Sequence, residues 1–107
     1  MRRAIAISIV LGAISLSGFG CAWVKLTPRG EQVREETAEN VVGCQDIGTA
    51  YGKTRTTALG LPRDKEVVRD EQVKLAQNQA ALIGGDTVVQ DGPPSGGTLN
   101  FKVYRCH

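Results

Sequence analysis

One strongly helical pattern dominates the middle of the chain, from residue 64 or 65 to residue 83. Its apolar side chains recur on one arc at helical spacing: Val68, Leu75, Ala76, Ala80, Leu82 and Ile83, with Asp70, Lys74, Gln77 and Ala81 on the opposite side. Glycines at positions 84 and 85 end the pattern, as is typical of a helix C-terminus. Gln72 and Gln79 fall inside the arc, and because buried amides need partners we expect them to bond strand backbone or to lie at its rim. The pattern predicts one helix that covers a sheet.

Two pairs of segments with β-branched residues and partial alternation flank this helix. Residues 31–36 and 41–49 predict a first hairpin. Residues 86–90 and 98–106 predict a second one, joined by a loop at 91–97 that is rich in proline and glycine. In the last segment one face is apolar, because polar residues alternate with Leu99, Phe101 and Val103. The sequence therefore predicts a single small α+β domain of order ββαββ, with one sheet covered on one face by one helix.

The first twenty residues have the composition of an export signal. Two arginines follow Met1, and an apolar run of 13 residues comes next, at positions 4–16. A helix that spans a bilayer needs about 20 apolar residues, so this run is too short by itself. The uncharged stretch continues to Val24, however, which leaves an uncleaved membrane anchor as the alternative. We expect a signal peptide at residues 1–20, a lipid anchor and short tether at 21–30, and a folded domain at 31–107.

Three cysteines are an odd number for an exported protein. We expect Cys44 and Cys106 to form a disulfide, because export places them in an oxidising compartment and the small mature domain has a marginal core. The alternative is a pair of buried thiols. Cys106 has the strand parity of Tyr104, so the bridge lies at the end of the sheet or a bulge shifts the register. Cys21 is then left over, and it is the expected lipidation site.

Charge and motif spacing argue against several classes of function. The formal net charge of +2 resides in Arg2 and Arg3, which leaves the mature domain near neutral and without the basic field of a nucleic-acid-binding protein. Residues 47–54 resemble a phosphate-binding loop but have three residues between the glycines where the motif needs four, so we expect no nucleotide. The only histidine, His107, is the last residue, and we therefore expect no catalytic triad, no metal site, no cofactor and no enzymatic activity.

Four basic residues gather around the threonine-rich connector at 54–62: Lys53, Arg55, Arg63 and Lys65. Guanidinium and ammonium groups bind anions through charge-assisted hydrogen bonds, so these residues form a candidate contact for a lipid phosphate or for carboxylates of a partner protein. The alternative is that they are the ordinary solvated charges of a loop.

Several blocks of the sequence resemble one family in order. They are Gln32-Val33-Arg34, Cys44-Gln45-Asp46-Ile47-Gly48-Thr49-Ala50 with Gly52-Lys53, Asn78-Gln79-Ala80-Ala81 running into Gly84-Gly85, and Val103-Tyr104-Arg105-Cys106. With them the chain resembles small bacterial lipoproteins catalogued as domain of unknown function 4156. The resemblance implies a lipid such as palmitate on Cys21 and a distant similarity to the disulfide-bonded signalling domain of the Rcs outer-membrane stress-sensor lipoprotein. It implies no activity. Gly18 and Phe19 depart from the usual lipoprotein cleavage site, so either signal peptidase is compatible with the sequence.

Taken together, these patterns predict a non-enzymatic lipoprotein of the bacterial cell envelope. We expect it to be anchored in the inner leaflet of the outer membrane, to face the periplasm, and to act as an accessory or sensory protein through contact with an envelope protein. A structural or wall-associated role at the membrane surface is the alternative function. A soluble periplasmic protein and an N-terminally membrane-anchored one are the alternative locations.

Overall fold

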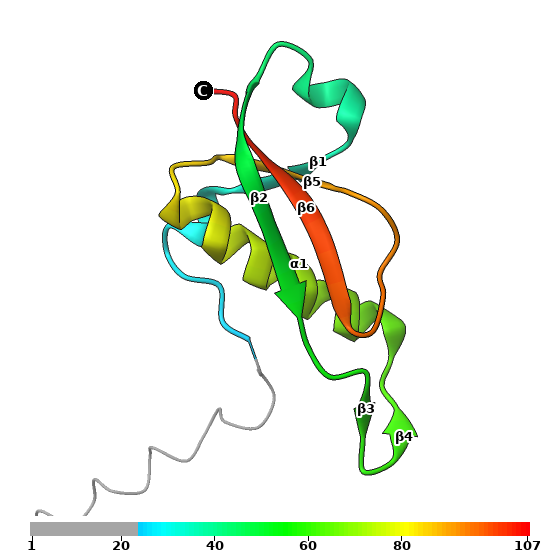
Figure 1. Cartoon of the computed structure of the whole chain (residues 1–107). Helices are drawn as coiled ribbons and strands as arrows, with labels where there is room; N and C mark the ends of the chain where they lie inside the picture. Colours follow the sequence, from blue (N-terminus) through cyan, green and yellow to red (C-terminus); the bar gives the residue numbers. More distant parts are fainter. Residues whose placement is uncertain (1–23) are drawn as a thin grey trace, which may run out of the picture.

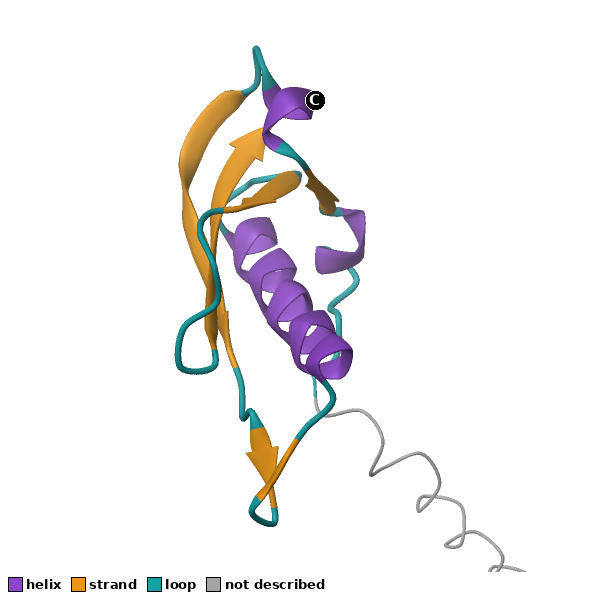
Figure 2. Cartoon of the chain, turned by 90° about the vertical axis from the view of Figure 1, so that its right-hand side faces the viewer, coloured by secondary structure: helices purple, strands orange, loops and turns teal. Residues whose placement is uncertain are grey.

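Four strands form one sheet, and a single long helix packs across one face of it (Figures 1 and 2). A computed structural model describes residues 24–107; the expected signal peptide, Cys21 and Trp23 lie outside this part of the chain. The strand order is β1-β5-β6-β2, and a separate two-stranded hairpin pairs β3 with β4. The elements are 3-10 helix η2 (Gly30–Gln32), β1 (Arg34–Glu36), 3-10 helix η3 (Ala38–Val41), β2 (Gln45–Lys53), β3 (Thr57–Ala58), β4 (Leu61–Pro62), α1 (Lys65–Leu82), β5 (Thr87–Gln90) and β6 (Thr98–Arg105).

The predicted first hairpin is wrong, because β1 and β2 lie at opposite edges of the sheet. β1 pairs in parallel with β5, with Glu35 opposite Val88, whereas β2 pairs antiparallel with β6. The reason lies in β5, whose residues Thr87, Val88 and Val89 are all buried. A strand that is buried on both faces occupies the middle of a sheet and needs a neighbour on each side. The second predicted hairpin, formed by β5 and β6, is confirmed.

The predicted helix is confirmed almost to the residue. The Asp64 side chain accepts a hydrogen bond from the amide of Glu66 at 2.8 Å and caps the first turn. Gln79 accepts from the amide of Tyr51 in β2 at 3.0 Å, a bond to strand backbone as expected. Gln72 is buried and donates at 2.9 Å to the carbonyl of Gly97, which lies in the loop just before β6 and not in a strand. α1 approaches β2 closely, because a Cβ on Gly52 would lie 2.1 Å from the Gln72 carbonyl oxygen.

The apolar arc of α1 differs from the prediction near its C-terminus. Leu82 is 78% exposed, since it lies about 120° around the helix from the fully buried Ala76. Ile83 is the helix cap with non-helical backbone angles, so it also leaves the arc and is half exposed. Ala81 is buried although it lies on the side that was expected to face solvent. On that side of α1, Gln77 and Asn78 bond the N-terminal segment of the domain, and Ala81 shares a buried cluster with Val33.

Asn78 holds this N-terminal segment against the helix. Its side-chain oxygen accepts hydrogen bonds from the amide and hydroxyl of Thr27 at 2.9 and 3.1 Å, and its amide group donates to the carbonyl of Lys25 at 2.9 Å. Gly30 packs beneath, where a Cβ would lie 2.3 Å from the Asn78 oxygen. Gln77 then donates to the carbonyl of Val33. Residues 25–30, which sequence analysis assigned to the tether, are therefore attached to the domain.

The disulfide between Cys44 and Cys106 is present, as predicted. Both expected ways of placing it are realised: the β2–β6 register shifts between Asp46 and Gly48, and the bridge lies just past the last strand pair, Gln45 with Arg105. Below it, the core between sheet and helix is centred on Phe101, Leu99, Val88 and Val103, which are all buried. Across residues 24–107, none of the helices combines the length and apolar character needed to span a bilayer.

Candidate functional site: a groove between helix, hairpin and loop

A groove of about 580 Å³ opens between the N-terminal half of α1, the base of the β3–β4 hairpin and the loop at 91–97. The groove thus lies between the connector at 54–62 and the loop at 91–97, both expected from the sequence, and the helix that lies between them in the chain. The lining residues are Thr56, Thr57, Pro62, Arg63, Lys65, Val68, Arg69, Gln72, Gln90, Pro94, Ser95, Gly96, Gly97 and Leu99. Much of this lining is apolar side chain, glycine and proline, so the groove is suited to contact with a polypeptide or another partly apolar ligand.

One wall of the groove is fixed by an ion pair between Arg63 and Glu71. The guanidinium contacts both carboxylate oxygens, at 2.7 and 3.1 Å, and the two side chains are only 10% and 8% exposed. The hydroxyl of Thr54 donates to the same carboxylate at 2.7 Å. The hydrogen bonds from Arg63 lower the pKa of Glu71 and outweigh the opposing effect of burial. These bonds hold two chain segments against α1: the segment that follows β2, through Thr54, and the segment that follows β4, through Arg63.

The opposite wall depends on Arg69, which forms an ion pair with Glu35 of β1. Its guanidinium also donates to the side-chain oxygen of Gln90 at 2.9 Å. The hydrogen bond to Glu35 raises the pKa of Arg69. Arg69 thereby links α1 to the edge strand β1 and to β5.

The four predicted basic residues take different positions. Arg63 and Lys65 line the groove, whereas Lys53 and Arg55 are exposed beside it. Arg63 also donates to the carbonyl of Arg55 at 2.9 Å, which brings these two residues together. Since the guanidinium of Arg63 is bound to Glu71, Lys53, Arg55 and Lys65 are the more accessible members of the set. Contact of these residues with an anion or partner stays a prediction.

Sequence analysis did not predict the β3–β4 hairpin. Its strands are two residues long, too short to show alternation, and Ala58 pairs directly with Leu61 across a turn formed by Leu59 and Gly60. Both turn residues have positive φ, 55° and 79°. A two-residue hairpin turn of this kind favours Asn-Gly. With leucine in place of asparagine, the turn could not be recognised from the sequence. Leu59 is fully exposed and Leu61 is 67% exposed.

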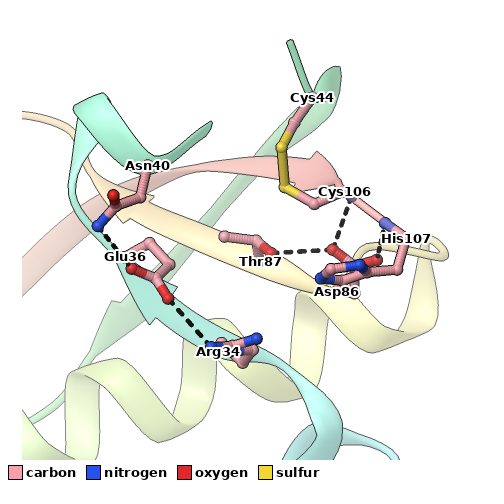
Figure 3. Close-up of a disulfide and its surroundings, with 8 residues drawn as sticks. All are labelled: Arg34, Glu36, Asn40, Cys44, Asp86, Thr87, Cys106 and His107. Atoms are coloured by element: carbon pink, nitrogen blue, oxygen red, sulfur yellow. Dashed lines mark hydrogen bonds and ion pairs between the residues drawn. A yellow bond between two sulfur atoms is a disulfide. The ribbon is translucent and has the colours of Figure 1, made fainter. Parts of the chain in front are cut away.

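A second, polar recess of about 480 Å³ surrounds the disulfide at the other end of the sheet (Figure 3). The carboxylate of Asp86 accepts from the amides of Cys106 and His107, at 2.8 and 2.9 Å, and from the hydroxyl of Thr87 at 2.9 Å. Burial of Asp86 would raise its pKa, but these hydrogen bonds outweigh it and the pKa lies below the ordinary value. Asp86 therefore fastens the C-terminus. Nowhere in residues 24–107 do three His, Cys, Asp or Glu side chains group in a way that could hold a metal ion.

Comparison with known proteins gives one result. Residues 24–106 match a family model described as Domain of unknown function (DUF4156). Neither a curated protein nor a solved structure matches the chain. The distant similarity to the Rcs signalling domain therefore stays a prediction. Because the match extends over almost the whole of the part that the structure describes, the chain belongs to the DUF4156 family.

Proposed function

We propose that this protein is a non-enzymatic envelope lipoprotein, anchored through Cys21 in the outer membrane, that binds a periplasmic segment of another envelope protein in the groove. The observation that carries the proposal is the construction of the groove. Its walls are held by ion pairs, and its floor is formed by the buried apolar side chains of Val68 and Leu99 beside residues 96 and 97. A preformed site of this kind binds a partner without first having to be ordered.

The attachment of residues 25–30 to α1 supports a role close to the membrane. If Cys21 carries the lipid, Lys25, the first residue bonded to Asn78, lies four positions further along the chain. Four positions of fully extended chain reach about 14 Å. The groove would thus stay near the bilayer surface, where the proposed partner would be an integral envelope protein or another lipoprotein.

Crosslinking in living cells tests the partner proposal. A photoreactive amino acid placed at Thr57 or Ser95, on opposite walls of the groove, should capture the same defined protein. The matched control is Asn100, which is exposed on the open face of the sheet and should capture nothing specific. Equal capture from all three positions, or none from the groove, refutes the proposal. Recovery with peptidoglycan alone would favour the wall-associated role.

The anchor requires a separate test. Metabolic labelling with a clickable fatty acid should mark the natural protein and leave Cys21→Ser unlabelled, and the variant should leave the membrane fraction. Labelling of both proteins to the same extent would show that Cys21 is not the site of lipidation.

A further inference from the structure

The tip of the β3–β4 hairpin presents two leucines to solvent. Leu59 is fully exposed and Leu61 is 67% exposed, although leucine ordinarily favours the core. Leu59 also has a φ of 55°, in the left-handed region that leucine rarely adopts. The fold gains no burial from these side chains and tolerates an unfavourable backbone to place one of them. Such strain concentrates at sites that contact other molecules.

The hairpin is held rigidly at its base, so its tip has a defined direction. The amide of Thr54 donates to the carbonyl of Gly97 at 3.0 Å, and the amide of Arg63 donates to the carbonyl of Thr56 at 2.8 Å. The ion pair of Arg63 with Glu71 adds a side-chain clamp. In Figures 1 and 2 the hairpin projects beyond the sheet and helix as a separate finger.

Basic residues surround the two legs of this finger. Residues 53–66 contain four basic side chains and two acidic ones, Asp64 and Glu66. Because Arg63 is paired with Glu71, an excess of one positive charge remains. Lys53, Arg55 and Lys65 are all exposed. An apolar tip with cations behind it matches the cross-section of an anionic bilayer surface, where acyl chains lie beneath phosphate groups.

The finger lies at the same end of the molecule as the first described residues of the chain. The N-terminal end of the described chain and the hairpin both lie in the lower half of Figures 1 and 2, and the C-terminus lies at the opposite, upper end. The short reach from Cys21 to the residues fastened by Asn78 brings this lower end against the membrane. A tether and a finger that point the same way would fix the orientation of the domain.

From this geometry we infer that the β3–β4 hairpin is a second membrane contact, which inserts Leu59 and Leu61 among the lipid acyl chains while Lys53, Arg55 and Lys65 lie at the phosphates. The inference rests on the proposed anchor at Cys21. The groove then opens directly behind the inserted tip, and the disulfide end points away from the bilayer.

The leucines dominate the strength of this contact. Complete burial of one leucine side chain strengthens membrane binding by about tenfold or more. A lysine or arginine near an anionic surface contributes about fivefold, and Asp64 and Glu66 offset part of that. We expect Leu59→Ser to weaken vesicle binding of the unlipidated mature chain (residues 21–107 with Cys21→Ser) by about tenfold, whereas removal of anionic lipid has the smaller effect.

An environment-sensitive fluorophore on the finger tests the inference. The mature lipidated protein with Leu59→Cys is labelled with a nitrobenzoxadiazole thiol reagent and reconstituted in vesicles of equal parts phosphatidylcholine and phosphatidylglycerol. The matched control is Ala38→Cys on η3, an exposed position far from the finger. We expect a blue-shifted emission that spin-labelled acyl chains quench at position 59, and a water-like emission at position 38. Leu61→Cys provides an independent second reading of the tip.

The outcomes separate this inference from the proposed anchor. Protein that floats with the vesicles but shows a water-like signal at positions 59 and 61 retains its anchor and refutes the finger. Protein that does not float at all refutes both. A signal at position 59 that shifts only when an envelope extract is added, and not with lipid alone, identifies the tip as a protein contact and also overturns the inference.

Discussion

Replacement of Leu59 by asparagine should make the protein more stable. A left-handed backbone costs an ordinary L-residue about 1–2 kcal/mol, and asparagine tolerates it because its short polar side chain bonds locally. Leu59 is fully exposed, so the change sacrifices no packing. With Gly60 it also produces the Asn-Gly pair that this turn favours. We expect Leu59→Asn to raise the free energy of unfolding by about 1 kcal/mol.

For a domain of this size, that gain corresponds to an increase of about 4–8 °C in Tm. Thermal unfolding followed by circular dichroism measures it. The matched control is Leu61→Asn, which makes the same chemical change at an exposed strand position that lacks a positive φ, and it should bring no gain. If the two variants have the same Tm, or Leu59→Asn unfolds earlier than the natural protein, the strain at Leu59 has been misread. The stabilised variant should nevertheless lose affinity for vesicles, since it lacks an apolar tip residue.

Three further predictions concern the clamp, the disulfide and the packing of α1. The folded state lowers the pKa of Glu71 below its ordinary value of 4.5, so the stability that the ionised carboxylate contributes is complete above about pH 4.5 and is lost as the pH falls through the folded pKa. In urea unfolding, the free energy of unfolding should therefore decrease less at acid pH in Glu71→Gln than in the natural protein. Replacing both Cys44 and Cys106 by serine should lower the free energy of unfolding by about 4 kcal/mol in the chain-entropy treatment of a loop that spans 62 positions, and an unchanged urea midpoint would contradict this. Gly52→Ala should destabilise the fold by about 1–3 kcal/mol through collision with the Gln72 carbonyl, whereas Thr49→Ala on the exposed side of β2 should unfold close to the natural midpoint.

Local patterns in the sequence were sufficient for the elements that local physics determines. Periodicity together with Asp64 at the start and Gly84 at the end defines α1, because capping and amphipathic spacing are properties of neighbouring residues. The same is true of the β5–β6 pair, whose connecting loop is recognisable from its prolines and glycines. The disulfide followed from the expected export to an oxidising compartment and from the count of cysteines.

Non-local pairing could not be predicted in this way. The alternation of residues 31–36 is compatible with any neighbouring strand, and only the burial of β5 on both faces selects the parallel arrangement. The docking of residues 25–30 depends on Asn78, some fifty positions away, so it left no mark within its own segment. At the candidate site, two of the four predicted cations line the groove, but the clamp on Arg63 was not foreseeable, because Glu71 had the expected role of an early acidic residue in a helix.

The fastening of the N-terminal segment by Asn78 has a mechanical consequence. A pull on the chain from its N-terminal side reaches the domain first at Thr27 and Lys25, through the three hydrogen bonds of one amide side chain. While those bonds hold, the pull is transmitted to α1 and the domain follows it as one body. When they break, residues 25–30 can extend, and the chain lengthens by about 20 Å before the pull reaches the sheet. With the proposed anchor at Cys21, Asn78 would thereby determine how far the groove can move from the bilayer.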